Sequence, residues 1–268
     1  MKEKSSKVYL YVYKIQILKS LAYKFDVYGN ILMQTIIMVA TAYFWQALFK
    51  NATSVQGVTV NTMLTYTVVS SMISVVLTTN VERRITLSIR KGTIAIDMMR
   101  PVNIFHVYFA ENLGGVTALL FQNLLPILII GSILIKLPAP DSVMSFFLFI
   151  GSLTLAFFVN WYLAVLFGML AFSVIEMDAL IQVKKHLIRL LSGSIIPIWF
   201  FPDWFQGILE VLPFVYLYQM PLDIFIGKYT MESLIRGLLI QLVWTIVLFF
   251  IYRAMQKKVT GKIMIQGG

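Results

Sequence analysis

The residues with the clearest capacity for binding chemistry lie in one segment of the chain, residues 82–103. Five positive charges fall within it, from Arg83, Arg84, Arg90, Lys91 and Arg100. Apolar residues recur at helical spacing, which predicts one apolar side of a helix over residues 83–101, made by Ile85, Ile89, Ile96 and Met99. A basic amphipathic helix of this kind can lie on a lipid surface or dock on a partner protein.

Two residues are expected to interrupt this helix. Gly92 divides it into two short pieces, and Pro101 disfavours helical backbone at Arg100 before it. The segment is less apolar than a membrane span and more apolar than a solvated loop, so we expect it to lie at a surface.

Catalytic and metal-binding patterns are missing from the sequence. It has no G-x-x-x-x-G-K-[ST] phosphate loop, so binding of ATP by the usual P-loop route is not expected. It has no cysteine, which excludes disulfides and thiolate metal sites. His106 and His186 lack a His or acidic partner at the spacing of metal ligands. We therefore predict no catalytic residue, no metal site and no cofactor bound by this chain.

The composition indicates a membrane protein. Hydrophobic residues make up 59% of the 268 residues, charged residues make up 13%, and the mean hydropathy is +0.82. Soluble domains are about 45–50% apolar and about 25% charged. The net charge of +10 could suggest nucleic acid, but the basic residues lie between apolar runs and not on one aromatic-rich face. The expected partner is the lipid bilayer and not nucleic acid.

The apolar runs predict an all-α membrane protein with a single transmembrane domain of six spans. The spans are expected at about residues 31–49, 63–80, 113–135, 143–172, 181–200 and 234–252. Lysines interrupt residues 8–28, which predicts an amphipathic helix in the membrane interface. Residues 203–227 contain prolines and apolar runs too short to cross, which predicts two short re-entrant helices that enter the membrane without crossing it.

The positions of Lys and Arg orient these spans. Eighteen of the 22 lie in the N-terminal region, residues 82–103, the connection around Lys184 and the tail after Tyr252. With six spans, all four segments fall on one side, which the positive-inside rule assigns to the cytoplasm. Both termini of a multi-pass plasma-membrane protein are therefore expected to be cytoplasmic.

Polar residues within the spans leave two interpretations open. Ionisable residues are absent from the interiors of the first four spans, which disfavours a proton- or sodium-driven transporter. Uncharged polar residues are present, at Gln34, Gln122, Asn123, Asn160 and Gln241. Such groups form hydrogen bonds between helices or line a substrate path. Gln34 and Asn160 are the candidates for lining a path.

Three motifs resemble the membrane-spanning subunits of ABC-2-type ATP-binding-cassette exporters. The first, RKGTIAIDMMRPVN, is similar to the family's cytoplasmic pattern through Lys91, Gly92, Ile94, Asp97, Met98, Met99, Arg100 and Pro101, with methionines where leucines are commoner. The second is LSGSIIPIWFFPDWFQGILEVLPFVYLYQMPLDIFIGK, residues 191–228, and the third is the terminal Ile-Gln-Gly-Gly. With the six-span order, the resemblance covers nearly the whole chain.

The resemblance implies a coupling helix that docks on a separate cytoplasmic ABC ATPase. Its residues would be Arg90, Lys91, Gly92, Ile94, Asp97, Met98, Arg100 and Pro101. Two copies of the ATPase, which carry ATP and Mg, and a second permease subunit, identical or homologous, would complete the transporter. The exported substrate would be an amphipathic or hydrophobic drug, peptide or lipid.

The resemblance also implies that the re-entrant helices close the outer side of the path. The residues concerned would be Pro197, Phe200, Phe201, Pro202, Pro213, Phe214 and Pro221. The phenylalanines could form a hydrophobic gate or serve in packing. A stand-alone channel or secondary transporter is the alternative function.

Overall fold

The chain folds into a bundle of α-helices, as the sequence predicts. The computed structural model describes residues 2–22, 24–51, 54–134, 139–174 and 176–266. Its helices are α1 (Lys2–Ala22), α2 (Lys24–Leu48), α3 (Val60–Val76), α4 (Val81–Arg90), α5 (Thr93–Met98), α6 (Ile104–Leu134), α7 (Val143–Met169), α8 (Met177–Leu191), α9 (Asp203–Val211), α10 (Val215–Ile226) and α11 (Met231–Gln266). Short 3₁₀ helices lie at Leu170–Phe172 and Ile198–Phe200.

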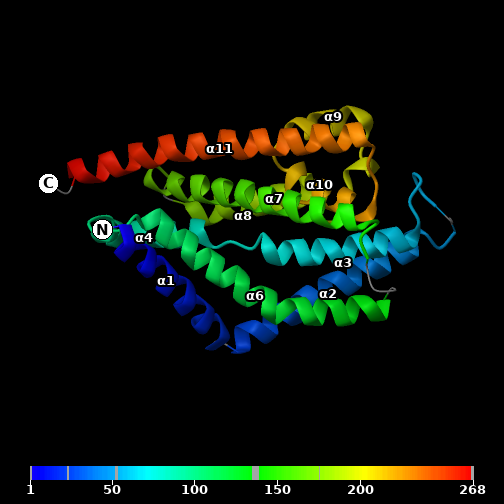
Figure 1. The fold of residues 1–268 in the computed structure, drawn as a ribbon, viewed down its shortest axis with the longest axis horizontal. Helices are drawn as coiled ribbons and strands as arrows, with labels where there is room; N and C mark the ends of the chain where they lie inside the picture. Colours follow the sequence, from blue (N-terminus) through cyan, green and yellow to red (C-terminus); the bar gives the residue numbers. More distant parts are fainter. Residues whose placement is uncertain (1, 23, 52–53, 135–138, 175, 267–268) are drawn as a thin grey trace.

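Five helical stretches within the described residues are long and apolar enough to cross a membrane. They are Val27–Leu48, Val60–Arg90, Ile104–Ile133, Val143–Phe172 and Met231–Gly261. The pair α9 and α10 meets the same test together but is bent by 108°. The long helices run side by side, with both chain ends and α4 at one end of the bundle and α9 at the other (Figure 1). We call these the basic end and the far end.

The first two helices differ from the expectation of one helix over residues 8–28 and a separate span from residue 31. Helix α1 ends at Ala22, and α2 is continuous from Lys24. Ile15 and Leu18 of α1 are exposed. The side of α1 toward α6 carries Tyr13, whose hydroxyl donates to Thr117 Oγ1 at 3.2 Å.

Close packing of α1 on α6 explains this difference. A Cβ atom added to Gly114 would lie 2.5 Å from the Tyr13 carbonyl oxygen, so only glycine allows the two backbones to approach this closely. Gln122 Nε2 adds a hydrogen bond to the Ser20 carbonyl at 3.3 Å. Helix α1 is therefore part of the bundle, with its other side exposed.

The second expected span is a broken helix. Helix α3 begins at the N-cap Thr59, whose hydroxyl accepts from the Thr62 amide, and it ends at Val76 instead of at residue 80. The chain continues into α4 after a short non-helical connection. Asn160 Nδ2 of α7 donates to the Leu77 carbonyl at 2.6 Å, so this buried carbonyl keeps a partner where the helix stops.

Helix α8 covers only Met177–Leu191, so the last residues of the expected span at 181–200 lie outside that helix. Gly193 has φ +80°, in the left-handed region, and Pro197 has no backbone N–H to continue a helix. Three successive carbonyls in this non-helical stretch accept hydrogen bonds from other helices. The donors are the Gln219 amide to Ser192 at 3.0 Å, the Tyr66 hydroxyl to Gly193, and Ser70 Oγ to Ser194 at 2.6 Å.

Gln219 of α10 holds this break together. Its backbone N–H donates to Ser192, and its side-chain Oε1 accepts from the Ile198 amide at 2.9 Å. The same oxygen lies 3.0 Å from the Tyr66 hydroxyl, and Nε2 donates to Asp223 at 2.7 Å. Because Gln219 is 4% exposed, these bonds form away from solvent.

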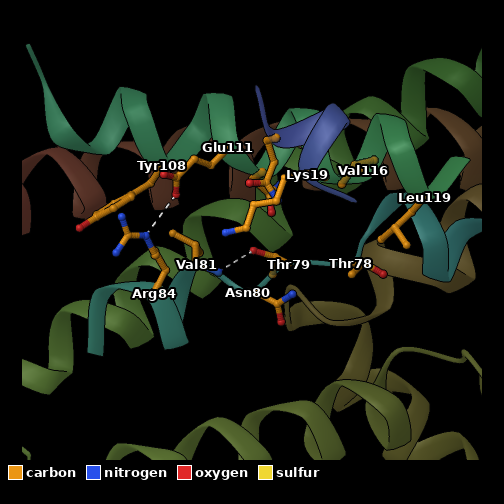
Figure 2. A pocket seen from close by; sticks show the side chains of 13 residues that line it. Lys19, Thr78, Thr79, Asn80, Val81, Arg84, Tyr108, Glu111, Val116 and Leu119 are labelled. Carbon is orange, nitrogen blue, oxygen red and sulfur yellow. Dashed lines mark hydrogen bonds and ion pairs between the residues drawn. The ribbon is translucent and has the colours of Figure 1, made fainter. Parts of the chain in front are cut away.

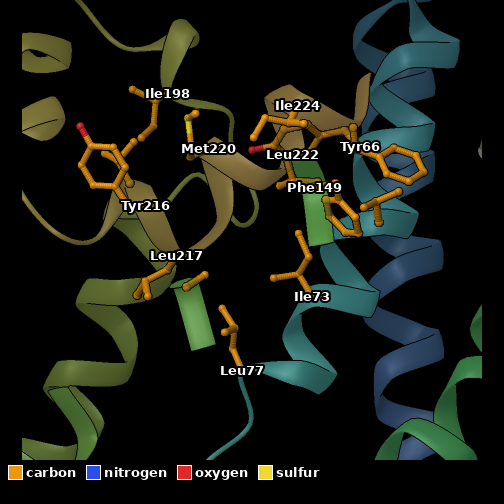
Figure 3. Packing of buried hydrophobic residues seen from close by; sticks show 14 of the residues in the cluster. Tyr66, Ile73, Leu77, Phe149, Ile198, Tyr216, Leu217, Met220, Leu222 and Ile224 are labelled. Carbon is orange, nitrogen blue, oxygen red and sulfur yellow. The ribbon is translucent and has the colours of Figure 1, made fainter. Parts of the chain in front are cut away.

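The largest apolar core surrounds the same region. It joins α3, α7, α10 and residues 192–200, and includes Tyr66, Phe149, Ile198, Leu217 and Leu222 (Figure 3). A second cluster packs α4 against α6, α7 and α11 at the basic end. The end of the expected third span at Ile135 and the terminal Gly267 and Gly268 lie outside the described residues.

Replacement of Gln219 by Leu keeps the side-chain volume and removes its polar contacts. We expect the free energy of unfolding to fall by about 2–4 kcal/mol, because buried partners at Ile198 and Asp223 lose their hydrogen bonds. Thermal unfolding in detergent measures this. Gln256→Leu is the matched control, since among the described residues the Gln256 side chain donates one hydrogen bond, to Asn103 Oδ1 at 3.4 Å. Equal midpoints for the two variants would contradict this role of Gln219.

Candidate functional site

The basic end of the bundle contains α4 and α5, the two pieces of the segment with the clustered positive charges. The first half of α4 is buried against α7. A Cβ atom on Gly168 of α7 would lie 3.0 Å from Glu82 Cα and 2.9 Å from Ile85 Cδ1, so the absence of a side chain there permits the contact. Helix α4 is therefore packed against α7 on one side, while Arg83, Arg84, Leu87 and Arg90 on its other side are exposed.

A buried ion pair anchors the start of α4. Lys184 Nζ of α8 lies 2.7 Å from Glu82 Oε1, and the two side chains are 4% and 1% exposed. The Lys184 ammonium also lies 5.8 Å from the centre of the Phe167 ring. Glu82 Oε2 has no hydrogen-bond partner in the part of the chain that the structure describes. The carboxylate therefore depends on Lys184 for its compensating charge.

A second ion pair joins α4 to α8 closer to the basic end. Arg90 Nη1 lies 2.9 Å from Asp178 Oδ2, and both side chains are partly exposed. Glu82 lies in the first turn of α4 and Arg90 in its last turn, while Asp178 lies in the first turn of α8, so the two pairs hold antiparallel helices at two points. Solvent screens the exposed pair of Arg90 with Asp178, so breaking it should lower the free energy of unfolding by less than breaking the buried pair of Glu82 with Lys184.

A third ion pair joins α4 to α6. Arg84 Nε lies 3.3 Å from Glu111 Oε2, and its guanidinium lies 5.5 Å from the centre of the Tyr108 ring. Arg84 also donates to Ser88 Oγ at 3.1 Å. Glu82, Arg84 and Arg90 of α4 therefore each form an ion pair with another helix of the bundle.

The chain turns sharply between α4 and α5. Gly92 has φ +68° and forms the N-cap of α5, and a Cβ atom added there would meet no heavy atom within 4 Å. Glycine is favoured at this position by its backbone angle and not by crowding. This turn rotates α5 relative to α4.

The rotation separates the residues expected on one apolar side. Ile85 is 1% exposed and faces the bundle, whereas Ile96 is 63% and Met99 is 85% exposed. Ile94, the apolar residue of α5 that is buried, is 6% exposed and attaches the helix to the protein. The single stripe is therefore wrong, and α5 instead presents an outward apolar surface of Ile96 and Met99.

The other expected coupling residues surround this surface. Lys91 is the C-cap of α4 and is exposed, and Met98 packs against the apolar cluster of the basic end. Asp97 is held by Arg100 through a contact of 3.3 Å, and Pro101 is exposed beyond it. The Ile96–Met99 surface thus lies beside positively charged side chains on a short, anchored helix.

The residues expected at the outer closure lie at the far end of the bundle. Phe200 stacks on Trp45 of α2 with ring centres 5.4 Å apart, and Phe201 contacts Phe205 of α9 at 5.5 Å. Pro197 and Pro202 precede short helices. Pro213 is buried before α10, Phe214 caps that helix, and Pro221 lies inside it.

The connection between α10 and α11 places a cation beside these residues. Lys228 Nζ lies 3.9 Å from the centre of the Trp199 ring. Burial lowers the pKa of Lys228 from its ordinary value, and the nearby Asp223 carboxylate partly opposes this shift.

The two residues suggested for a substrate path both form hydrogen bonds between helices. Gln34 Nε2 of α2 donates to Ser74 Oγ of α3 at 3.2 Å, and Asn160 donates to Leu77. Gln241 similarly joins α11 to α7 and α10, donating to the Ser152 and Tyr216 carbonyls at 2.9 Å. These contacts correspond to the interhelical alternative that the sequence left open.

Comparison with protein families now adds independent evidence. A family model described as "ABC-2 family transporter protein" matches residues 35–267, which is most of the chain. The chain belongs to the ABC-2 transporter family. Comparison with curated proteins finds no match.

Membership of the ABC-2 transporter family agrees with several helices able to cross a membrane and identifies a multi-pass membrane protein. The family also implies association with an ABC ATPase. The matched range includes α4, α5 and the broken far end. The buried pair of Glu82 with Lys184 was missed by sequence reasoning, since the two residues are 102 positions apart and each lies beside other charges.

Replacement of Lys184 by Met tests the buried pair. We expect it to lower the free energy of unfolding by about 3–5 kcal/mol, because the Glu82 carboxylate is left buried without a partner. The double variant Glu82→Gln, Lys184→Met is expected to lose less than Lys184→Met alone, as measured by thermal unfolding in detergent. Arg236→Met is the control, since it breaks an exposed pair with Glu210 worth about 0–1 kcal/mol. A double variant less stable than Lys184→Met would contradict the expected dependence.

Proposed function

We propose that this chain is the permease half of an ATP-driven exporter, and that α5 docks on a separate cytoplasmic ABC ATPase. The observation that carries the proposal is the outward surface of Ile96 and Met99 on a short helix anchored through Ile94 and α4. Large apolar side chains exposed beside basic residues are suited to a protein groove. Crossing the membrane does not by itself require an exposed helix such as α5 at the end of a span.

The proposed transmission route runs from α5 through α4 to α8. Motion of the ATPase would be passed to α4, which is joined to α8 by the pairs of Glu82 with Lys184 and Arg90 with Asp178. The other end of α8 leads into residues 192–194, whose carbonyls are bound by α3 and α10. ATP could shift the conformation only if the ATPase binds the two states of the permease differently.

The proposed topology has six crossings. Helix α8 together with residues 192–200 would make the fifth crossing, supported by the protein-bound carbonyls of its non-helical part. Helices α9 and α10 would be the re-entrant pair on the extracellular side, which their 108° bend supports. Both termini, α4 and α5 would then lie in the cytoplasm.

The complete exporter would contain two ATPase copies and a second permease subunit, identical or homologous. ATP and Mg would be bound by the ATPase, and the permease would contribute half of the path across the plasma membrane. The substrate would be an amphipathic or hydrophobic drug, peptide or lipid moved outward in an efflux reaction.

A secondary transporter is the alternative, and one observation favours it. Glu82 and Lys184 are ionisable and buried within the helical bundle. Secondary transporters bind and transfer their coupling ions at buried ionisable residues. The opposite charges of Glu82 and Lys184 compensate each other, which suits a structural link better than a site that takes up protons. Transport that requires ATP hydrolysis by a co-purifying protein distinguishes the exporter from this alternative.

Replacement of both Ile96 and Met99 by Glu tests the docking surface. We expect ATPase co-purification and ATP-dependent transport to fall at least tenfold, because charge would replace the apolar contact, while the thermal midpoint of the chain stays close to wild type. Ile96→Leu is the control that keeps an apolar side chain. Normal ATPase recovery with the Glu variant would contradict docking through α5.

Replacement of Phe200 by Ala tests whether this residue helps to close the outer side of the path. Phe200→Ala removes the stack on Trp45, and we expect a higher ATPase rate without substrate or a measurable leak in vesicles. Phe205→Ala is the control, because it removes an aromatic contact to Phe201 at the same end without touching Trp45. Unchanged leak and ATPase rates would assign Phe200 to packing alone.

A further inference from the structure

A polar cavity lies between α1, α6 and the connection from α3 to α4. Its volume is about 520 Å³. Figure 2 shows the side chains that line it. It is lined by Gln16, Lys19, Thr78, Thr79, Asn80, Val81, Arg84, Tyr108, Glu111, Asn112, Gly115, Val116 and Leu119. The α6 residues of this lining belong to the candidate span Ile104–Ile133. The cavity therefore places polar groups beside the first turns of a helix that is able to cross a membrane.

The charges that line the cavity leave one cation uncompensated. Arg84 is paired with Glu111 at 3.3 Å, and these two charges cancel. Lys19 makes no hydrogen bond or ion pair with any residue that the structure describes. Figure 2 shows its side chain directed toward the segment of Thr79 to Val81. The lining has a formal net charge of +1 and is suited to a singly charged anion.

The α6 residues that line the cavity change from polar near the basic end to apolar farther along the helix. A lipid molecule has the same order, from its polar headgroup to its apolar acyl chains. Tyr108, Glu111 and Asn112 lie nearer the basic end, and Val116 and Leu119 follow deeper along the helix. On the outer side of α1, the apolar side chains of Leu10, Ile15 and Leu18 are exposed together with Lys14, and these apolar side chains are suited to contact with acyl chains. A soluble phosphate would use the polar part of the cavity and leave the apolar part without a contact.

We propose that this cavity binds the headgroup of an anionic phospholipid from the leaflet at the basic end. Lys19 pairs with the phosphodiester, the amides of Gln16, Asn80 and Asn112 donate hydrogen bonds, and Val116 and Leu119 contact the first acyl carbons. The preference for an anionic over a zwitterionic lipid follows from the single uncompensated charge. Binding needs neither ATP nor a partner and is independent of the proposed export function.

Lipid retention by the purified full-length chain tests the proposal. The wild type and the variants Lys19→Ala, Lys19→Glu and Lys14→Glu are equilibrated with equal amounts of phosphatidylglycerol and phosphatidylcholine, and retained lipid is identified by intact-protein mass spectrometry. Lys14 is the matched control, because it is an exposed lysine of the same helix outside the cavity. A parallel sample contains inorganic phosphate as the soluble source of the same anion.

The wild type is expected to retain phosphatidylglycerol in preference to phosphatidylcholine. Loss of one charge should weaken this retention about fivefold in Lys19→Ala, and by more in Lys19→Glu, whereas Lys14→Glu should retain it nearly as the wild type does. The lipid-free thermal midpoint of Lys19→Ala should match the wild type, so a folding defect would be recognised. Equal retention by Lys19→Glu and Lys14→Glu, no preference between the two lipids, or displacement of lipid by inorganic phosphate would each overturn the proposal.

Discussion

Backbone carbonyls freed inside an apolar bundle must find donors, and this constraint governs the places where the helices of this protein break. Where α3 ends, the Leu77 carbonyl is bound by Asn160. Where α8 ends, three successive carbonyls are bound by Gln219, Tyr66 and Ser70. Unpaired groups in such surroundings cost several kcal/mol each, by order of magnitude. The polar side chains of α3, α7 and α10 are therefore structural requirements of the broken helices, and they fix where the far end of α8 can lie.

Helix α8 consequently has fixed contacts at both ends. Near the basic end, Lys184 and Asp178 attach it to α4, and beyond Leu191 its carbonyls are held by α3 and α10. A buried ion pair is seldom needed for stability alone, because well-packed apolar residues often serve as well. The pair of Glu82 with Lys184 instead fixes the register of α4 against α8. An element held in this way can carry a displacement from one end of the bundle to the other.

Sequence reasoning succeeds here where one residue type determines the local outcome. Apolar runs predicted the long helices, Gly92 predicted the division between α4 and α5, and the prolines after Pro197 predicted short broken pieces. It failed where the outcome depends on a distant partner. The approach of α1 to α6 requires the small Gly114, and the end of α8 requires donors from α3 and α10. The spacing of residues in the sequence does not predict these contacts, because their partners come from other parts of the chain.

Mass analysis of the intact wild-type complex, purified gently from its native membrane, tests whether this chain works as half of an ATP-driven exporter. We expect a complex with two permease subunits and two copies of a soluble ATPase, and the same spectrum shows whether the second permease is identical to this chain or different. Recovery of the chain alone or as a simple oligomer, with transport that persists without ATP, would contradict the exporter and favour a channel or secondary transporter.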